Sequence, residues 1–85
     1  MPWFLYILES EQNGMFYTGI SPNVDHRLEF HNRLGHGFTA RYRPWKKVFT
    51  KKYPNRQLAQ SVEKKIKDRK NKEYIKRIIN HSFEP

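Results

Sequence analysis

The hydrophobic and polar positions near the start of the chain form two apolar segments with a polar segment between them. Residues 3–8 are apolar without a break, and residues 15–20 are rich in strand-forming types. The intervening residues 9–14 are polar and end in Asn13-Gly14, a strong hairpin signal. The pattern predicts a β-hairpin, and residues 3–8, apolar on both faces, are expected to form a central strand.

The register of this hairpin decides whether Tyr6 and Tyr17 share a face of the sheet. Side chains alternate along a strand and antiparallel partners share a face, so the tyrosines share a face whenever paired residue numbers add up to an odd value. A two-residue Asn13-Gly14 turn meets this condition. A four-residue loop over residues 10–13 also meets it, and sets Tyr6 directly opposite Tyr17. Both turns remain open, and because Tyr is common in strands the pair alone requires no function.

Helical spacing begins after Ile20. Ser21 as N-cap and Pro22 at the first helical position predict a helix over residues 22–33. Two glycines then end the helix, and the glycines, proline, arginines and aromatics of residues 34–45 predict a surface loop.

A third strand is predicted over residues 46–53, and its lysine-rich ends suit an edge position. A helix over residues 57–70 follows, with Asn55 as a possible cap, and a last helix starts at Asn71. The apolar positions of these two helices are Leu58, Ala59, Val62 and Ile66 in the first, and Tyr74, Ile75, Ile78 and Ile79 in the second.

The element order is therefore β-β-α-β-α-α. It predicts an α+β fold with a small three-stranded antiparallel sheet flanked by three helices. A chain of 85 residues suits one small domain, expected over residues 1–80, with a loose tail over residues 81–85.

The charge changes the functional picture. The 17 Lys and Arg against 8 Asp and Glu leave a net charge of +9, which favours a polyanionic partner, most often nucleic acid and less often an anionic membrane surface. The alternative is a protein whose surface is basic but which binds no such partner. The chain has no cysteine, which excludes disulfides, thiol chemistry and Cys-based zinc sites. No leader pattern and no apolar run of about 18 residues is present, so a cytoplasmic protein is the default expectation.

Several polar residues stand where a purely structural design would not require them. Arg27 and His31 share one helix face, Tyr17 precedes Gly19 by two, and Glu63 borders an apolar stripe. Each also has a structural explanation: an Arg stem packs at a helix boundary, and a Glu can pair with the Lys four residues later. His26, His36 and His81 show no partner pattern and are expected at the surface.

Together, Tyr17, Arg27, His31 and Glu63 provide the functional groups needed to hydrolyse a phosphodiester bond. Arg binds phosphate through a planar fork of donors, and one carboxylate can hold a Mg²⁺ that keeps most of its waters. A phenol with a pKa near ~10 is a poor base at neutral pH, but nearby cations can favour the phenolate. His31 could instead take or relay the proton.

The loop over residues 39–47 is the candidate for substrate contact outside this set. Arg41, Arg43 and Lys46 would contact phosphates. Trp45 could stack on a base, but anchoring the loop to the core is the favoured interpretation.

The spacing resembles the GIY-YIG endonuclease superfamily. The first signature triplet falls on Phe4-Leu5-Tyr6, where only the tyrosine is kept, and the second on Tyr17-Thr18-Gly19. Residues 24–32 look like the family's Arg-Leu-x-x-His-Asn segment, and residues 61–67 look like its Glu-bearing helix. The closing residues 71–76 resemble small stand-alone members, related to the nuclease domain of the nucleotide-excision-repair incision subunit.

The resemblance implies a DNA endonuclease, with branched and damaged DNA among the candidate substrates. It implies that Glu63 binds one Mg²⁺ or Mn²⁺ ion. Tyr6 and Tyr17 would line the site, one of them as general base. Arg27 would hold the scissile phosphate, and His31 would assist proton transfer. Lys67 joins the expected nucleic-acid contacts. The alternatives are a nucleic-acid-binding module without chemistry and a small protein that binds an acidic partner; the oligomeric state stays open.

Overall fold

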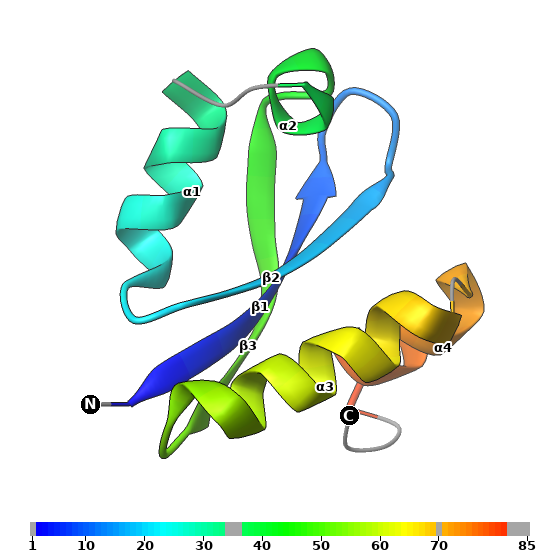
Figure 1. Ribbon diagram of the computed structural model, residues 1–85. Helices are drawn as coiled ribbons and strands as arrows, with labels where there is room; N and C mark the ends of the chain where they lie inside the picture. Colours follow the sequence, from blue (N-terminus) through cyan, green and yellow to red (C-terminus); the bar gives the residue numbers. More distant parts are fainter. Residues whose placement is uncertain (1, 34–36, 70, 82–85) are drawn as a thin grey trace.

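Three antiparallel strands form the sheet at the centre of this computed structural model, in the order β2-β1-β3 (Figure 1). The strands are β1 (Trp3–Ser10), β2 (Phe16–Ser21) and β3 (Trp45–Tyr53). The helices are α1 (Val24–Arg33), the four-residue α2 (Phe38–Arg41), α3 (Arg56–Arg69) and α4 (Lys72–Ile79). The structure describes residues 2–33, 37–69 and 71–81. The α+β prediction is confirmed, with β1 central and β3 at an edge as expected.

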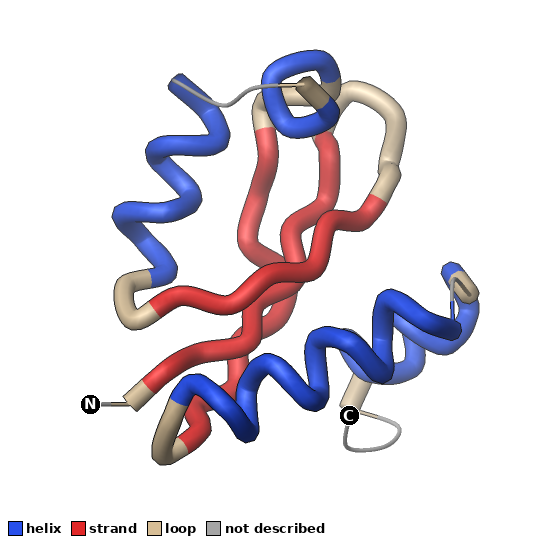
Figure 2. Tube along the Cα trace, viewed as in Figure 1, coloured by secondary structure: helices blue, strands red, loops and turns tan. Residues whose placement is uncertain are grey.

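Helices cover both faces of the sheet (Figure 2). Leu5 and Ile7 of β1 pack with Ile66 of α3 and Ile78 of α4 on one face. The alternate side chains of β1 point to the opposite face, where Val24 of α1 and Trp45 pack against them. Because β1 is buried on both faces, its unbroken apolar sequence is explained.

The hairpin loop spans residues 11–14, so both expected turns are wrong. The Ser10 N–H donates to the Met15 carbonyl (2.8 Å) and the Gly14 N–H to the Ser10 carbonyl (2.9 Å). Gly14 closes the loop with φ +76°, a conformation that glycine adopts without strain. Tyr6 consequently pairs with Gly19 instead of Tyr17. The paired numbers still add up to an odd value, so the prediction that the two tyrosines share a face is confirmed.

The helix ends show which caps were placed correctly. Asn23, rather than Ser21, caps α1, because its Oδ1 accepts the His26 N–H (3.0 Å), and the helix begins at Val24 instead of residue 22. The Ser21 hydroxyl instead accepts the Asn23 N–H in the preceding turn. The cap expected at Asn55 is confirmed, since it accepts the Leu58 N–H (3.0 Å). The helix start expected at Asn71 is confirmed too, because Asn71 caps α4 by accepting the Glu73 and Tyr74 N–H groups.

Three further expectations need correction or lie outside the described residues. Residues 38–41 of the expected loop form α2, and Trp45 already belongs to β3. Leu58 was expected in the core but is 47% exposed in the first turn of α3. Residues 34–36, Lys70 and the tail residues 82–85 lie outside the described part of the chain.

Within the described residues, no helix has both the length and the apolar composition that crossing a membrane requires.

Candidate active site

Tyr6 lies on the central strand with its ring over Gly19 of β2. A Cβ atom on residue 19 would come within 2.5 Å of the Tyr6 Oη and 2.6 Å of its Cζ, far closer than atoms can pack. Gly19 is therefore the residue that admits the Tyr6 ring. The group that approaches this glycine closely is the tyrosine of the facing strand.

Two phenols and an imidazole meet on this face of the sheet, in a group we call the tyrosine-histidine cluster (Tyr6, Tyr17 and His31). The Tyr6 Oη and His31 Nε2 atoms lie 3.1 Å apart and share a hydrogen bond. The His31 ring meets the edge of the Tyr17 ring with centroids 5.0 Å apart, and the two tyrosine rings lie 6.4 Å apart. Tyr6 and His31 are each 2% exposed, whereas Tyr17 is half-buried.

Burial sets the protonation of this cluster. It raises the pKa of Tyr6 to about 12, with Tyr17 adding to the rise and the nearby Arg27 guanidinium opposing it. Burial also lowers the pKa of His31 to about 4, and the Arg27 charge pushes in the same direction. At neutral pH the cluster therefore holds a protonated phenol next to a neutral imidazole. The His31 Nδ1 atom is buried and has no hydrogen-bond partner among the described residues.

Arg27 places the positive charge beside these groups. It lies one helical turn before His31 on α1, is half-buried, and its guanidinium stacks 4.7 Å from the centroid of the Phe30 ring. Its charge and a hydrogen bond act on the Tyr6 phenol. The shared helix face predicted for Arg27 and His31 thus points at the tyrosines.

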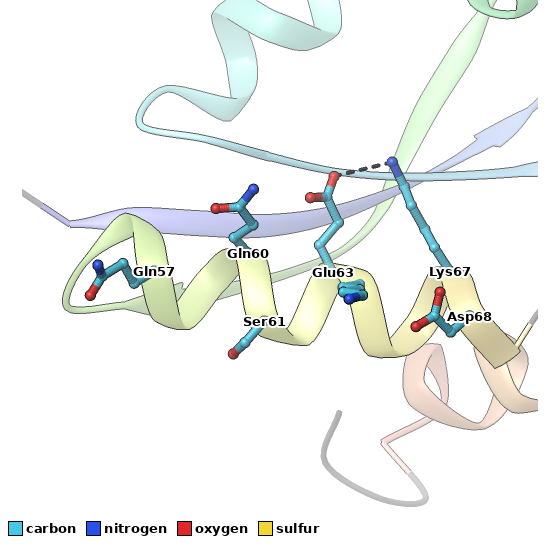
Figure 3. Close-up of a pocket in the computed structure, with 7 residues that line it drawn as sticks. Gln57, Gln60, Ser61, Glu63, Lys67 and Asp68 are labelled. Atoms are coloured by element: carbon cyan, nitrogen blue, oxygen red, sulfur yellow. Dashed lines mark ion pairs between the residues drawn. The ribbon is translucent and has the colours of Figure 1, made fainter.

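The carboxylate of the site comes from the opposite layer. α3 packs along β2, and the side chains of Glu63 and Lys67 extend from it toward that strand (Figure 3). The Lys67 Nζ atom lies 3.2 Å from a Glu63 carboxylate oxygen and 5.6 Å from the centre of the Tyr17 ring. The Glu63 side chain is only 19% exposed. The expected pairing of Glu63 with Lys67 is therefore confirmed, and the paired side chains lie on the side of α3 that faces β2.

Asn32 and Trp45 complete the surroundings, and the importance of Asn32 was missed in the sequence. The Asn32 amide donates to the Trp45 carbonyl (3.1 Å) and accepts the Trp45 N–H (2.6 Å). The Trp45 indole donates to the Thr39 carbonyl (2.8 Å), and its ring lies 6.1 Å from that of Tyr17. Trp45 is 3% exposed, which confirms that it anchors its segment to the core. The adjacent His31-Asn32 pair was the available signal.

Three of the predicted contact residues, Arg41, Arg43 and Lys46, lie in or between α2 and β3. Arg41 and Lys46 are exposed, and Lys46 approaches Glu9 at 3.7 Å. Arg43 donates to the Arg33 carbonyl (3.2 Å). Of the other histidines, His26 and His81 are exposed as expected, while His36 lies outside the described residues.

The donor set suits one hard divalent cation. Among the described residues no three His, Asp or Glu side chains gather into a metal site, so Glu63 stands alone beside the cluster. One carboxylate is sufficient for Mg²⁺, which retains waters and uses substrate phosphates as further ligands. The Glu63 carboxylate lines a surface hollow on α3 together with Gln60 and Lys67, where a phosphate could reach it. These residues fit such an ion.

Comparison with known proteins agrees with this geometry. The GIY-YIG catalytic domain family matches residues 2–77. A UPF0213 protein of Nitratidesulfovibrio vulgaris (strain Hildenborough) is 35% identical over 66 residues, which cover 76% of this chain and 59% of the relative. The solution structure of the UPF0213 protein from Bacillus halodurans has the same fold, with a TM-score of 0.61 and 24% identity over 100% of this chain and 89% of that one. The chain belongs to the GIY-YIG family, a family of nuclease type.

Proposed function

We propose that the protein is a divalent-metal-dependent endonuclease that hydrolyses phosphodiester bonds in DNA. The observation that carries the proposal is the meeting of Tyr6, Tyr17, Arg27 and His31 from β1, β2 and α1 with Glu63 from α3. These residues are far apart in the sequence. A purely structural core would not need a neutral imidazole, a guanidinium and a carboxylate around two phenols.

Arg27 is the proposed phosphate-binding residue. A guanidinium donates two parallel hydrogen bonds to a phosphate and stabilises negative charge that develops on it. Its half-buried position strengthens that electrostatic effect, because water screens the charge less. Stacking on Phe30 limits its conformational freedom before substrate arrives.

Proton transfer is assigned to Tyr17 and His31 rather than to Tyr6. A base must lose its proton near the working pH, and the raised pKa of Tyr6 disfavours its phenolate. His31 is neutral at pH 7, and because its lowered pKa disfavours the imidazolium, it would relay a proton rather than hold it. Tyr6 would orient the imidazole through their 3.1 Å hydrogen bond. Tyr17, half-buried and in edge contact with His31, would exchange a proton with the attacking water.

Glu63 would hold a Mg²⁺ or Mn²⁺ ion, which supplies charge stabilisation of the leaving oxygen. Lys67 pairs with the same carboxylate (3.2 Å) and would compete with such a cation for it. The Lys67 side chain is half-exposed, so it can turn to a substrate phosphate instead.

A cleavage assay tests the proposal. Labelled single-stranded, duplex and branched DNA, and matched RNA, would be incubated with Mg²⁺, Mn²⁺ or EDTA. We expect metal-dependent cuts that Glu63→Gln and Tyr17→Phe abolish. Glu73→Gln on the exposed face of α4 removes the same charge away from the site and should leave cutting unchanged. Absence of cutting on every substrate, or full activity of Glu63→Gln, would refute the nuclease proposal.

A second candidate, a nucleic-acid-binding module without chemistry, is favoured by the 3.2 Å Lys67–Glu63 contact, which occupies the carboxylate. In that case DNA binding in EDTA depends on Arg41 and Arg43 and is unaffected by Glu63→Gln, and no substrate is cut. Binding to nucleic acid together with metal-dependent turnover would exclude it.

A further inference from the structure

The outward side of α3 carries cations that its own structure leaves uncompensated. Ala59 and Ile66 of this helix face the core, while Lys64 and Lys65 are exposed. Within the described residues, the ion pair formed on α3 joins Lys67 to Glu63, and no acidic side chain pairs with Lys64 or Lys65. Two free ammonium groups therefore lie one helical turn or less from the carboxylate of the proposed site.

This side of α3 is continuous with the site. The hollow that Glu63 and Lys67 line extends over α3, and a second hollow shares Ser61, Lys64 and Asp68 with it before continuing to Lys65. In Figure 3, Gln60, Glu63 and Lys67 extend toward β2, whereas Ser61 leaves the helix on the other side. A ligand chain that starts at Glu63 can thus cross α3 without meeting a barrier of apolar side chains.

The lining groups match a sugar-phosphate backbone. Amide, hydroxyl and ammonium groups donate hydrogen bonds to phosphate oxygens without reading base identity. Gln60, Lys64 and Lys65 supply amide and ammonium donors, whereas the Ser61 hydroxyl already donates to the Leu58 carbonyl (2.8 Å). Asp68 is the acidic exception among the residues that line the second hollow, and it opposes an anion there.

We propose that the outer surface of α3, formed by Gln60, Ser61, Lys64 and Lys65, binds the backbone of the nucleic-acid strand that leads away from the cleavage site. The inference rests on the proposed function for the placement of a phosphate at Glu63. A helix with side chains is about 10 Å wide, and each strand of a duplex that crosses it advances about 3.4 Å along the duplex axis per nucleotide. The strand therefore crosses α3 over about three nucleotides, with two of its phosphates on the two lysines.

The test measures DNA binding in EDTA, where cleavage cannot interfere. Binding of labelled duplex DNA would be followed by fluorescence anisotropy across a salt series. Each lost phosphate contact lowers the slope of log affinity against log salt by about 0.9. The Lys64→Gln/Lys65→Gln variant should therefore lose about 1.8 from the slope. The matched control is Lys76→Gln/Arg77→Gln, which removes two adjacent exposed charges from α4 and should keep the parental slope.

A gain-of-binding variant guards against a loss that comes from misfolding. Asp68→Asn removes the opposing charge and should tighten binding on the order of twofold. Three outcomes would each overturn the inference. The two double variants could lose equally from the slope, Lys64→Gln/Lys65→Gln could bind like the parent, or Asp68→Asn could leave the affinity unchanged. Lysine-dependent binding to anionic vesicles without binding to DNA would overturn it too.

The two proposals fail separately. If the parent protein cuts no substrate but its DNA binding depends on Lys64 and Lys65, the nuclease proposal falls and the binding surface stands. If the parent cuts DNA and the Lys64→Gln/Lys65→Gln variant has parental KM, kcat and salt slope, the nuclease proposal stands and this surface is refuted.

Discussion

At the residue scale, the site depends on how Tyr6 and His31 are buried. The Tyr6 ring fits only because residue 19 has no side chain. The burial that follows raises the pKa of Tyr6 and lowers that of His31. A tyrosine and a histidine exposed to water would keep ordinary pKa values, so the chemistry of the cluster follows from its packing.

Gly19→Ala should therefore destabilise the protein. The added methyl group collides with the Tyr6 ring, and overpacking of this kind costs about 1–3 kcal/mol. Urea unfolding would measure the cost. The same change made in a Tyr6→Ala background should cost much less, because the ring it collides with is absent. An equal cost in both backgrounds would contradict the contact.

His31 should make the protein less stable in acid. Its pKa is about 4 in the folded protein against 6.5 in the unfolded chain, so the unfolded state takes up the proton first as the pH falls below about 6.5. The free energy of unfolding should drop by up to about 3 kcal/mol as the pH approaches 4.

The charged neighbour of His31 is Arg27, and its ring contacts include Tyr17 and Tyr6, whose pKa of about 12 lies far above this range. Urea unfolding of the parent and His31→Gln at pH 7 and 4.5 would isolate the effect from the carboxylates, which both proteins share. His26→Gln, altered at an exposed position, should keep the parental pH dependence. A parental dependence in His31→Gln would disprove the assignment.

At the element scale, a bulge in β3 decides what faces the cluster. Ile7 pairs with Phe49, but Leu8 pairs with Lys47, so Val48 is an extra residue in the strand. Without it, Trp45 would point to the face covered by α3 and α4. With it, Trp45 turns to the tyrosine face, where Asn32 of α1 binds its backbone.

Asn32→Ala should weaken the contact between α1 and β3. It leaves the Trp45 N–H without its acceptor, and losing one partner of a buried hydrogen bond costs about 1–3 kcal/mol. Asn23→Ala is the matched control, since it removes the α1 cap at a cost of about 1 kcal/mol and does not touch Trp45.

We expect Asn32→Ala to change the near-ultraviolet circular dichroism of the buried tryptophan and to lower kcat in the proposed nuclease assay. Asn23→Ala should do neither under conditions where it stays folded. Identical behaviour of the two variants would reduce Asn32 to a general stabilising role.

At the scale of the whole molecule, the charges are unevenly distributed along the chain. Residues 1–33 contain four acidic and two basic side chains, whereas residues 34–85 contain fifteen basic and four acidic ones. Two acidic groups of the first part pair with lysines of β3, through Lys46–Glu9 and Lys47–Asp25. The excess positive charge therefore lies on the later elements, including the α2–β3 segment and α3.

Arg41→Gln/Arg43→Gln tests the contribution of the α2–β3 segment. If both residues contact phosphates, the salt slope for duplex DNA falls by about 1.8. Anisotropy titrations next to the Lys76→Gln/Arg77→Gln control would measure it. A parental slope would remove this segment from the binding surface, and would fit the observed use of Arg43 in holding the Arg33 carbonyl.

The sequence by itself determined the parts of this protein that depend on neighbours in the chain. Alternation and helical spacing identified each long element, the unbroken apolar run placed β1 at the centre, and Asn55 and Asn71 marked helix starts. Tertiary structure decided the loop over residues 11–14, the bulge at Val48 and the exposure of Leu58. It also decided that Asn32 holds Trp45 and that α3 brings Glu63 to the tyrosines. These features rest on contacts between residues distant in sequence, whose free energies no local pattern contains.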